Sequence, residues 1–179
     1  IKIMSDTKKE SKYQQMEHLQ HIKELPDTYV GSSIKLEKEL FIYEDGKIVK
    51  KVVTWVPAVY KIFDEIVVNA IDNHTRTKRE KEKFPKKMIR VMDKLEVNIY
   101  KETGVISVLN TGEGIEVKKI DTEKQKDIYV IELIFGELLT SENFKDGKEK
   151  KVTGGKNGYG AKLTNIFSEE FTVESVDRK

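Results

Sequence analysis

Two acids and two amides share one side of the stretch from Ile62 to Asn73, which reads IFDEIVVNAIDN. At about 100° per residue in a helix, they fall on one narrow stripe: Glu65, Asn69, Asp72 and Asn73. The rest of the circumference is mostly apolar, which is typical of a buried helix. Buried polar groups need partners, so we expect the stripe to face a pocket, a metal or a bound polar molecule. The alternative is a core helix whose polar stripe faces water.

A second candidate site is the run GGKNGYGAK, where four of the 11 glycines lie within seven residues: Gly154, Gly155, Gly158 and Gly160. Such a run lets backbone N–H groups surround an anion, and the helix expected after it offers its positive N-terminal end. Lys156 and Lys162 add positive charge. The spacing matches neither G-x-x-x-x-G-K-[ST] nor G-x-G-x-x-G, so a surface turn is the alternative.

A third candidate is the turn Asn110-Thr111-Gly112-Glu113-Gly114, which follows an expected strand. A plain tight turn is the simpler interpretation. A side-chain amide at a strand end, beside two glycines, can also bind the edge of a flat heterocycle at close range.

Composition limits the class of protein. The 179 residues suit one domain. Lys and Arg number 33 against 31 Asp and Glu, a net charge of +2, so overall charge alone gives no argument for DNA binding. Without cysteine there are no disulfides or thiolate metal sites, which is compatible with a reducing compartment. We find no apolar run of membrane-spanning length and expect no membrane partner.

The elements that must position these residues follow from periodicity and turn signals. Residues 1–12 are expected to be a flexible arm, and residues 76–88 a solvated connector, with a phosphate-contacting surface as the alternative. His21 is expected to pack or hydrogen-bond near the Pro26 turn. Helices are expected over residues 13–25, 62–73, 128–139 and 163–168, and strands over residues 40–43, 48–56, 95–100, 105–109 and 171–176. The order predicts an α+β fold, a largely antiparallel mixed sheet with helices packed on one face.

The order of the three motifs resembles the GHKL ATPases, which include type II topoisomerases, MutL-type repair proteins, a heat-shock chaperone and histidine kinases. Longer blocks are similar to the ATPase domain of type IIA DNA topoisomerases of the eukaryotic or large-virus kind: YQQMEHLQHIKELPDTYVGS, FDEIVVNAIDN, LIFGELLTSENF and VTGGKNGYGAKLTNIFS. The resemblance implies a GHKL ATP-binding domain over residues 13–179. The first residue is Ile1, and we expect a fragment that lacks the transducer and DNA-cleavage domains of that family.

The resemblance also implies residue roles. Glu65 would be the general base, Asn69 would bind Mg²⁺, Asn73 would belong to the ATP site and Asn110 would bind adenine. Tyr13 would reach the nucleotide of a partner subunit. The ribose and phosphate contacts would come from Ser141, Glu142 and Asn143, and the lid over the triphosphate from Gly155, Lys156, Asn157, Gly158, Tyr159, Gly160, Ala161 and Lys162. Three positions depart from the usual family residues: Thr111, Glu116 and Glu142.

The implied function is Mg²⁺-dependent ATP hydrolysis that closes a homodimeric gate around double-stranded DNA. The implied setting is intracellular: the nucleus in a eukaryote, or the host cytoplasm or virion for a virus. Two alternatives remain at this point. One is another GHKL ATPase, such as a histidine kinase or chaperone, and the other is a non-enzymatic interaction module with a mobile glycine loop.

Overall fold

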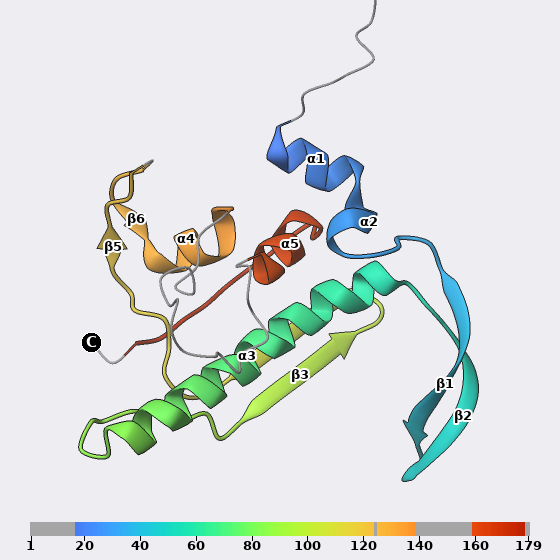
Figure 1. Ribbon diagram of the computed structural model, residues 1–179, viewed down its shortest axis with the longest axis horizontal. Helices are drawn as coiled ribbons and strands as arrows, with labels where there is room; N and C mark the ends of the chain where they lie inside the picture. The colour runs from blue at the N-terminus through green and yellow to red at the C-terminus, as the bar shows by residue number, and fades with distance from the viewer. Residues whose placement is uncertain (1–16, 124, 139–158, 178–179) are drawn as a thin grey trace, which may run out of the picture.

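The computed structural model describes residues 17–123, 125–138 and 159–177 (Figure 1). In chain order, its helices are α1 (His18–Glu24), α2 (Pro26–Tyr29), α3 (Pro57–Lys83), α4 (Val130–Gly136) and α5 (Gly160–Ile166). Its strands are β1 (Leu36–Glu44), β2 (Lys47–Trp55), β3 (Leu95–Tyr100), β4 (Val105–Asn110), β5 (Lys119–Ile120) and β6 (Ile128–Tyr129). The α+β class and the antiparallel pairing are confirmed. Within the described residues the strands form three two-stranded sheets.

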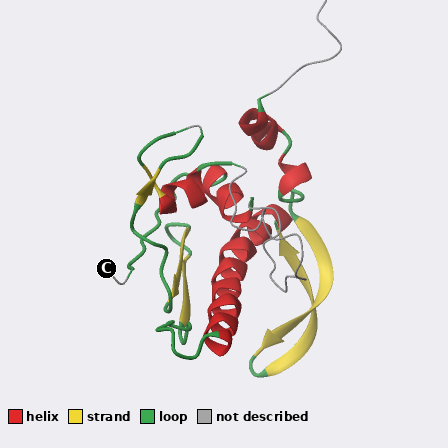
Figure 2. Cartoon of the chain, turned by 60° about the vertical axis from the view of Figure 1, so that its left-hand side comes forward, coloured by secondary structure: helices red, strands yellow, loops and turns green. Residues whose placement is uncertain are grey.

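The β1–β2 hairpin forms between the two strands expected over residues 40–43 and 48–56, with Asp45 and Gly46 at its turn. Asp45 and Gly46 have φ angles of 51° and 79°, the conformation of a two-residue turn that suits strand twist. Glu44 therefore pairs with Lys47. The ribbon extends away from the helices (Figure 2). β1 is longer than expected, because its pairing continues back to Leu36, whereas β2 has the expected length and begins one residue earlier than expected.

Helix α3 is the longest element and extends well beyond Asn73. Pro57 starts it, where a missing N–H costs little. The helix continues to Lys83, so the connector expected over residues 76–88 was wrong for its first half. Arg, Lys and Glu are good helix formers, and the buried Thr77 hydroxyl donates to the Asn73 carbonyl at 2.7 Å.

The expected burial of α3 on nearly all sides was also wrong. With the described residues in place, only Ala70 and Thr77 of this helix are buried, and Ile71 is 47% exposed. Among those residues, α5 is the main element packed against α3, as Figures 1 and 2 both show. The apolar circumference of α3 is therefore covered chiefly on one side.

The N-terminal helices differ in detail from expectation. Pro26 ends α1 as predicted but also begins α2, so residues 26–29 form a short helix rather than a turn. Proline is favoured at this first helical position. The His21 ring nitrogen Nδ1 lies 2.9 Å from the Tyr29 hydroxyl, which confirms its expected hydrogen bond near the Pro26 turn.

The C-terminal segment is extended but forms no strand ladder with the described residues, so the strand expected over residues 171–176 was wrong. Side chains of this segment accept hydrogen bonds from backbone N–H groups that would otherwise be available to a strand ladder. Ser175 Oγ accepts from the Ile115 N–H at 2.9 Å, and Asp177 Oδ2 accepts from the Val117 N–H at 2.7 Å. These bonds hold the segment against residues 114–117.

The hydrophobic core of the described residues lies where α1, α2, α3 and α5 meet. Ile22, Val30 and Leu163 are buried together there. Partly buried side chains surround them: Tyr29, Ala58, Ile62, Leu138, Tyr159, Ile166 and Phe167. This core fixes α5 against the first half of α3. None of the described helices is both long enough and apolar enough to cross a membrane.

Candidate functional site

Glu65 lies directly against the first residue of α5. A Cβ atom built on Gly160 would be 1.9 Å from Glu65 Oε2 and 3.1 Å from Glu65 Cβ, so only glycine fits there as the side chains stand. Thr164 Oγ1, one helical turn further, donates to the Ile62 carbonyl at 2.8 Å. The end of the glycine-rich run and the acid of α3 are therefore fastened side by side.

The Glu65 carboxylate is partly buried and paired. Its side chain is 19% exposed and forms an ion pair with Lys61, one turn earlier on α3. The hydrogen bond to Glu65 is the main cause of the raised pKa of Lys61, so that ammonium is charged at neutral pH. Lys61 was not among the predicted site residues, although the four-residue spacing of Lys61 and Glu65 on a helix was a usable signal.

The two asparagines of the polar stripe on α3 differ in their burial and hydrogen bonding. Asn69 is exposed, so its amide is accessible to a ligand. Asn73 is partly buried: its Nδ2 donates to the Glu113 carbonyl at 3.2 Å, and its Oδ1 accepts from Arg76 Nη2 at 2.9 Å. Asn73 thus joins α3 to the 110–114 turn.

The 110–114 turn is held on several sides. Gly112 has a φ angle of 105°, and a Cβ there would lie 2.9 Å from the Met92 nitrogen. A Cβ on Gly114 would lie 2.2 Å from the Val176 carbonyl oxygen. Thr111 Oγ1 accepts from the Asp93 and Lys94 N–H groups at 3.1 and 3.0 Å. That gives a physical role to a residue that departs from the family pattern.

Asn110 ends β4 and is exposed. Its Nδ2 donates to the Thr111 carbonyl at 3.1 Å. The amide therefore stays at the strand end, accessible from solvent, and the turn that carries it is tied to α3 through Asn73.

The described part of the lid, Tyr159 to Lys162, packs inward. Ala161 and Lys162 are buried, and Lys162 is 3% exposed. Burial lowers the pKa of Lys162 to about 8. A buried amine has lost hydration, so an anion such as a phosphate would stabilise its charged form. Tyr159 packs edge-on against the ring of His18, with ring centres 5.7 Å apart.

Several predicted site residues lie outside the described residues: Tyr13, Ser141, Glu142, Asn143, Gly155, Lys156, Asn157 and Gly158. The described residues hold no group of three or more His, Asp or Glu side chains arranged to bind a metal ion.

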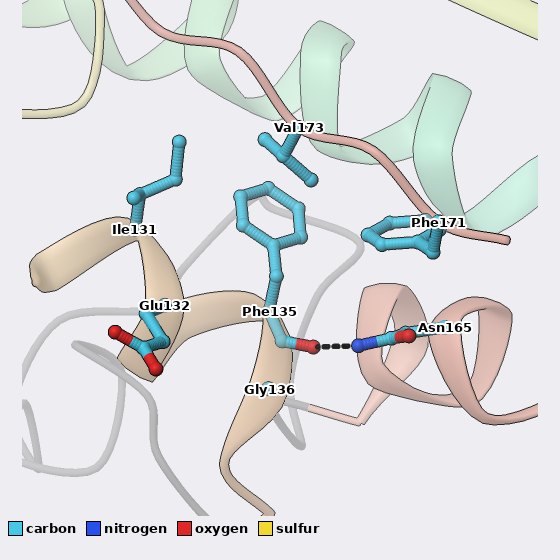
Figure 3. Close-up of a pocket in the computed structure, with 7 residues that line it drawn as sticks. All are labelled: Ile131, Glu132, Phe135, Gly136, Asn165, Phe171 and Val173. Atoms are coloured by element: carbon cyan, nitrogen blue, oxygen red, sulfur yellow. Dashed lines mark hydrogen bonds between the residues drawn. The ribbon is translucent and has the colours of Figure 1, made fainter.

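A separate small hollow lies between α4, α5 and residues 171–173 (Figure 3). The rings of Phe135 and Phe171 line it with centres 6.0 Å apart, and Asn165 Nδ2 donates to the Phe135 carbonyl at 3.0 Å. The hollow contains none of the predicted site residues.

The amino-acid sequence of this chain is strongly similar to those of one group of known proteins. No family model matches the chain. It is 49% identical over 168 residues to DNA topoisomerase 2 of Pisum sativum, covering 94% of this chain and 10% of that protein. It is 50% identical over 168 residues to DNA topoisomerase 2-alpha of Mus musculus, covering 93% of this chain and 10% of the relative.

Solved structures of the same group of proteins also match the fold of this chain. The ATPase region of Saccharomyces cerevisiae topoisomerase II matches with a TM-score of 0.72 and 46% identity, covering 88% of this chain and 38% of that one. The ATPase and transducer domains of Balamuthia mandrillaris DNA topoisomerase II match with a TM-score of 0.71 and 44% identity, covering 88% and 36%.

The fold is that of a GHKL ATPase. Within that class, the chain belongs to the DNA topoisomerase II family and corresponds to its ATPase region. It spans about a tenth of the length of the curated relatives it matches.

Proposed function

We propose that this chain binds ATP with Mg²⁺ and hydrolyses it, as the ATPase region of a DNA topoisomerase II. The observation that carries the proposal is the contact between Glu65 and Gly160. It puts a carboxylate where a glycine-rich run meets a helix, and the buried Lys162 adds a cation on that helix. A proton acceptor beside an anion-binding segment is what attack of water on a phosphate requires.

In the proposed reaction, a water oxygen attacks the γ-phosphorus of ATP. The bond from that phosphorus to the oxygen bridging to the β-phosphorus breaks, which releases ADP and inorganic phosphate. Glu65 takes the proton of the attacking water. The Lys61 ion pair orients the Glu65 carboxylate, and Lys162 stabilises phosphate charge.

The residues present fit Mg²⁺. The Asn69 side chain is exposed and offers an amide oxygen, a hard ligand that suits this ion. It lies four residues after Glu65, about 6 Å along the helix axis at 1.5 Å per residue. When bound, Mg²⁺ would neutralise phosphate charge. Asn110, at the end of β4, would bind the adenine edge.

We extend the proposal to the whole protein. ATP would close two copies of this region into a gate that captures a segment of double-stranded DNA, with Tyr13 reaching the nucleotide of the partner subunit. Hydrolysis would reset the gate. The protein would act inside the cell: in the nucleus of a eukaryote, or in the host cytoplasm or virion of a virus.

The deciding experiment measures both the binding of an ATP analogue and the turnover of ATP. We expect calorimetry with a non-hydrolysable ATP analogue and Mg²⁺ to give binding heat for the wild-type chain and for Glu65→Ala. We expect the full-length Glu65→Ala protein to lose ATP turnover. Wild-type turnover in that variant would remove Glu65 as the base, and no binding heat in the wild type would favour a non-enzymatic interaction module. The 179-residue chain alone is expected to hydrolyse ATP slowly.

A histidine kinase or chaperone-like ATPase is the second candidate. The high identity to topoisomerase II over 93–94% of the chain counts against it. An ATP-dependent supercoil-relaxation assay on the full-length protein separates the two, because only the topoisomerase changes DNA linking number.

A further inference from the structure

Positive charge is concentrated at the far end of α3. Residues 76–90 hold eight of the 33 Lys and Arg residues but only two of the 31 Asp and Glu residues. This segment, which we call the basic end of α3, therefore carries a net charge of +6. The rest of the chain carries −4. The near-neutral total therefore conceals one strongly positive segment.

The basic end is an ordered surface. Residues 76–83 are helical, and the buried Thr77 fixes which side faces the protein. At about 100° per residue, Arg76, Arg79 and Lys83 lie on the side opposite Thr77. They are exposed, and their spacing of three and four residues places them in one row.

The turn after the helix extends this row. Lys86 and Lys87 are exposed, and Lys87 forms an ion pair with Glu80, which folds the turn back onto α3. That pair also neutralises one of the two acids of the segment. Among the described residues, no carboxylate forms an ion pair with Arg79, Lys83 or Lys86.

Two exposed apolar side chains accompany the cations. Phe84 is 49% exposed and Met88 is 84% exposed. Lys83 Nζ lies 5.7 Å from the centre of the Phe84 ring. Cations near a helix C-terminus also interact favourably with the helix dipole. That effect acts within the last turn, so it does not explain the cations at 86, 87 and 90.

Arg76 of the basic end touches the candidate ATP site through its hydrogen bond to Asn73, but the later cations lie far along the chain from Glu65. Arg79 lies 14 residues after Glu65, about 21 Å along the helix at 1.5 Å per residue. Figures 1 and 2 show the C-terminal turns of α3 at the opposite end of the helix from α5. Substitutions at Arg79, Lys83 and Lys86 can therefore be separated from effects on nucleotide chemistry.

We propose that the basic end of α3 binds the phosphate backbone of duplex DNA without reading its sequence. The choice of duplex DNA rests on the proposed function. The charge complementarity rests on the structure, because a row of unneutralised Lys and Arg side chains is the feature that binds phosphates and releases their counterions.

The test compares two triple variants of the 179-residue chain that remove equal charge. The first neutralises the basic end: Arg79→Gln, Lys83→Gln and Lys86→Gln. The second neutralises exposed lysines on other elements: Lys38→Gln, Lys47→Gln and Lys101→Gln. Glutamine keeps helix propensity similar to that of lysine and arginine, and thermal melts check that both variants fold.

Binding to a fluorescent duplex of about 30 base pairs is measured by anisotropy over a range of salt concentrations. We expect the first variant to bind on the order of 10- to 100-fold more weakly at 0.1 M salt, with the slope of log K against log salt reduced by up to about 2.7, near 0.9 for each lost phosphate contact. We expect the second variant to bind like the wild type.

Equal losses in the two variants would overturn the proposal, as would no loss in either. Binding of the wild type to phosphatidylserine vesicles but not to the duplex would assign the surface to membranes and overturn it too. ATP-analogue binding is measured in the same samples. Its absence in the wild type would count against the proposed function while leaving the DNA comparison readable.

Discussion

The contact between Gly160 and Glu65 allows a prediction worked from the structure. A Cβ at Gly160 would stand 1.9 Å from Glu65 Oε2, whereas such contacts are essentially never shorter than 3.0 Å. In Gly160→Ala, the carboxylate oxygen must therefore move by more than about 1 Å. A displacement of that size in a reacting group can cost about 100-fold in rate.

Gly160→Ala should lower the free energy of unfolding by less than it raises the activation free energy of ATP hydrolysis. Overpacking costs about 1–3 kcal/mol, and alanine recovers up to about 1 kcal/mol in helix propensity over glycine. We expect the full-length Gly160→Ala protein to lose ATP turnover on the order of 100-fold while the melting temperature falls by only a few degrees.

Gly136→Ala is the matched control. A Cβ at Gly136 meets no atom within 4 Å, and its φ angle is not in the left-handed region, so turnover should not change. Glu65→Asp withdraws the carboxylate by one methylene and so makes room for the added Cβ. The double variant Glu65→Asp, Gly160→Ala should therefore lose less activity than the losses of the two single variants added together. Wild-type turnover in Gly160→Ala would refute the assigned contact.

Three further predictions concern the same helices. Lys61→Met should lower kcat about 10- to 100-fold with little change in KM for ATP, because Glu65 loses its orienting partner; Lys61→Arg should retain more activity, and steady-state kinetics of the full-length protein would show this. Thr164→Val should cost about 1–3 kcal/mol in the free energy of unfolding, because the Ile62 carbonyl loses its hydroxyl donor; urea unfolding measures it, and a change under 0.5 kcal/mol would contradict it. Because burial lowers the pKa of Lys162 to about 8 from 10.5, the folded chain binds fewer protons than the unfolded chain between these values. Stability should therefore rise with pH across that window, while affinity for an ATP analogue should weaken above pH 8 as the ammonium is lost. Lys162→Arg should flatten both pH dependences, which thermal melts and calorimetry can follow.

Local signals predicted local structure well. The Asp45-Gly46 turn fixed the hairpin because positive φ angles at those two residues suffice to reverse the chain. The length of α3 was underestimated because the charge of residues 76–83 was given more weight than their helix propensity. The segment 171–176 has strand composition, but strand propensity needs a partner, and Ser175 and Asp177 side chains occupy the neighbouring backbone donors.

The site was predictable as a set of residues but not as a geometry. Motif order identified Glu65 and the glycine-rich run, yet their contact depends on how α5 packs on α3. No spacing rule covers residues so far apart in the chain. The Lys61 ion pair lies within one helical turn, so the sequence alone could have suggested it. The Asn73 bond to Glu113 depends on tertiary packing.

The close approach of backbone to backbone at Gly114 has a genetic consequence. The atom that an added Cβ would meet at 2.2 Å belongs to the main chain of Val176, and a main chain, unlike a side chain, has no second rotamer. Every missense codon at position 114 adds at least that carbon. A saturation library selected for function should return many different amino acids at position 136 and a single one at position 114.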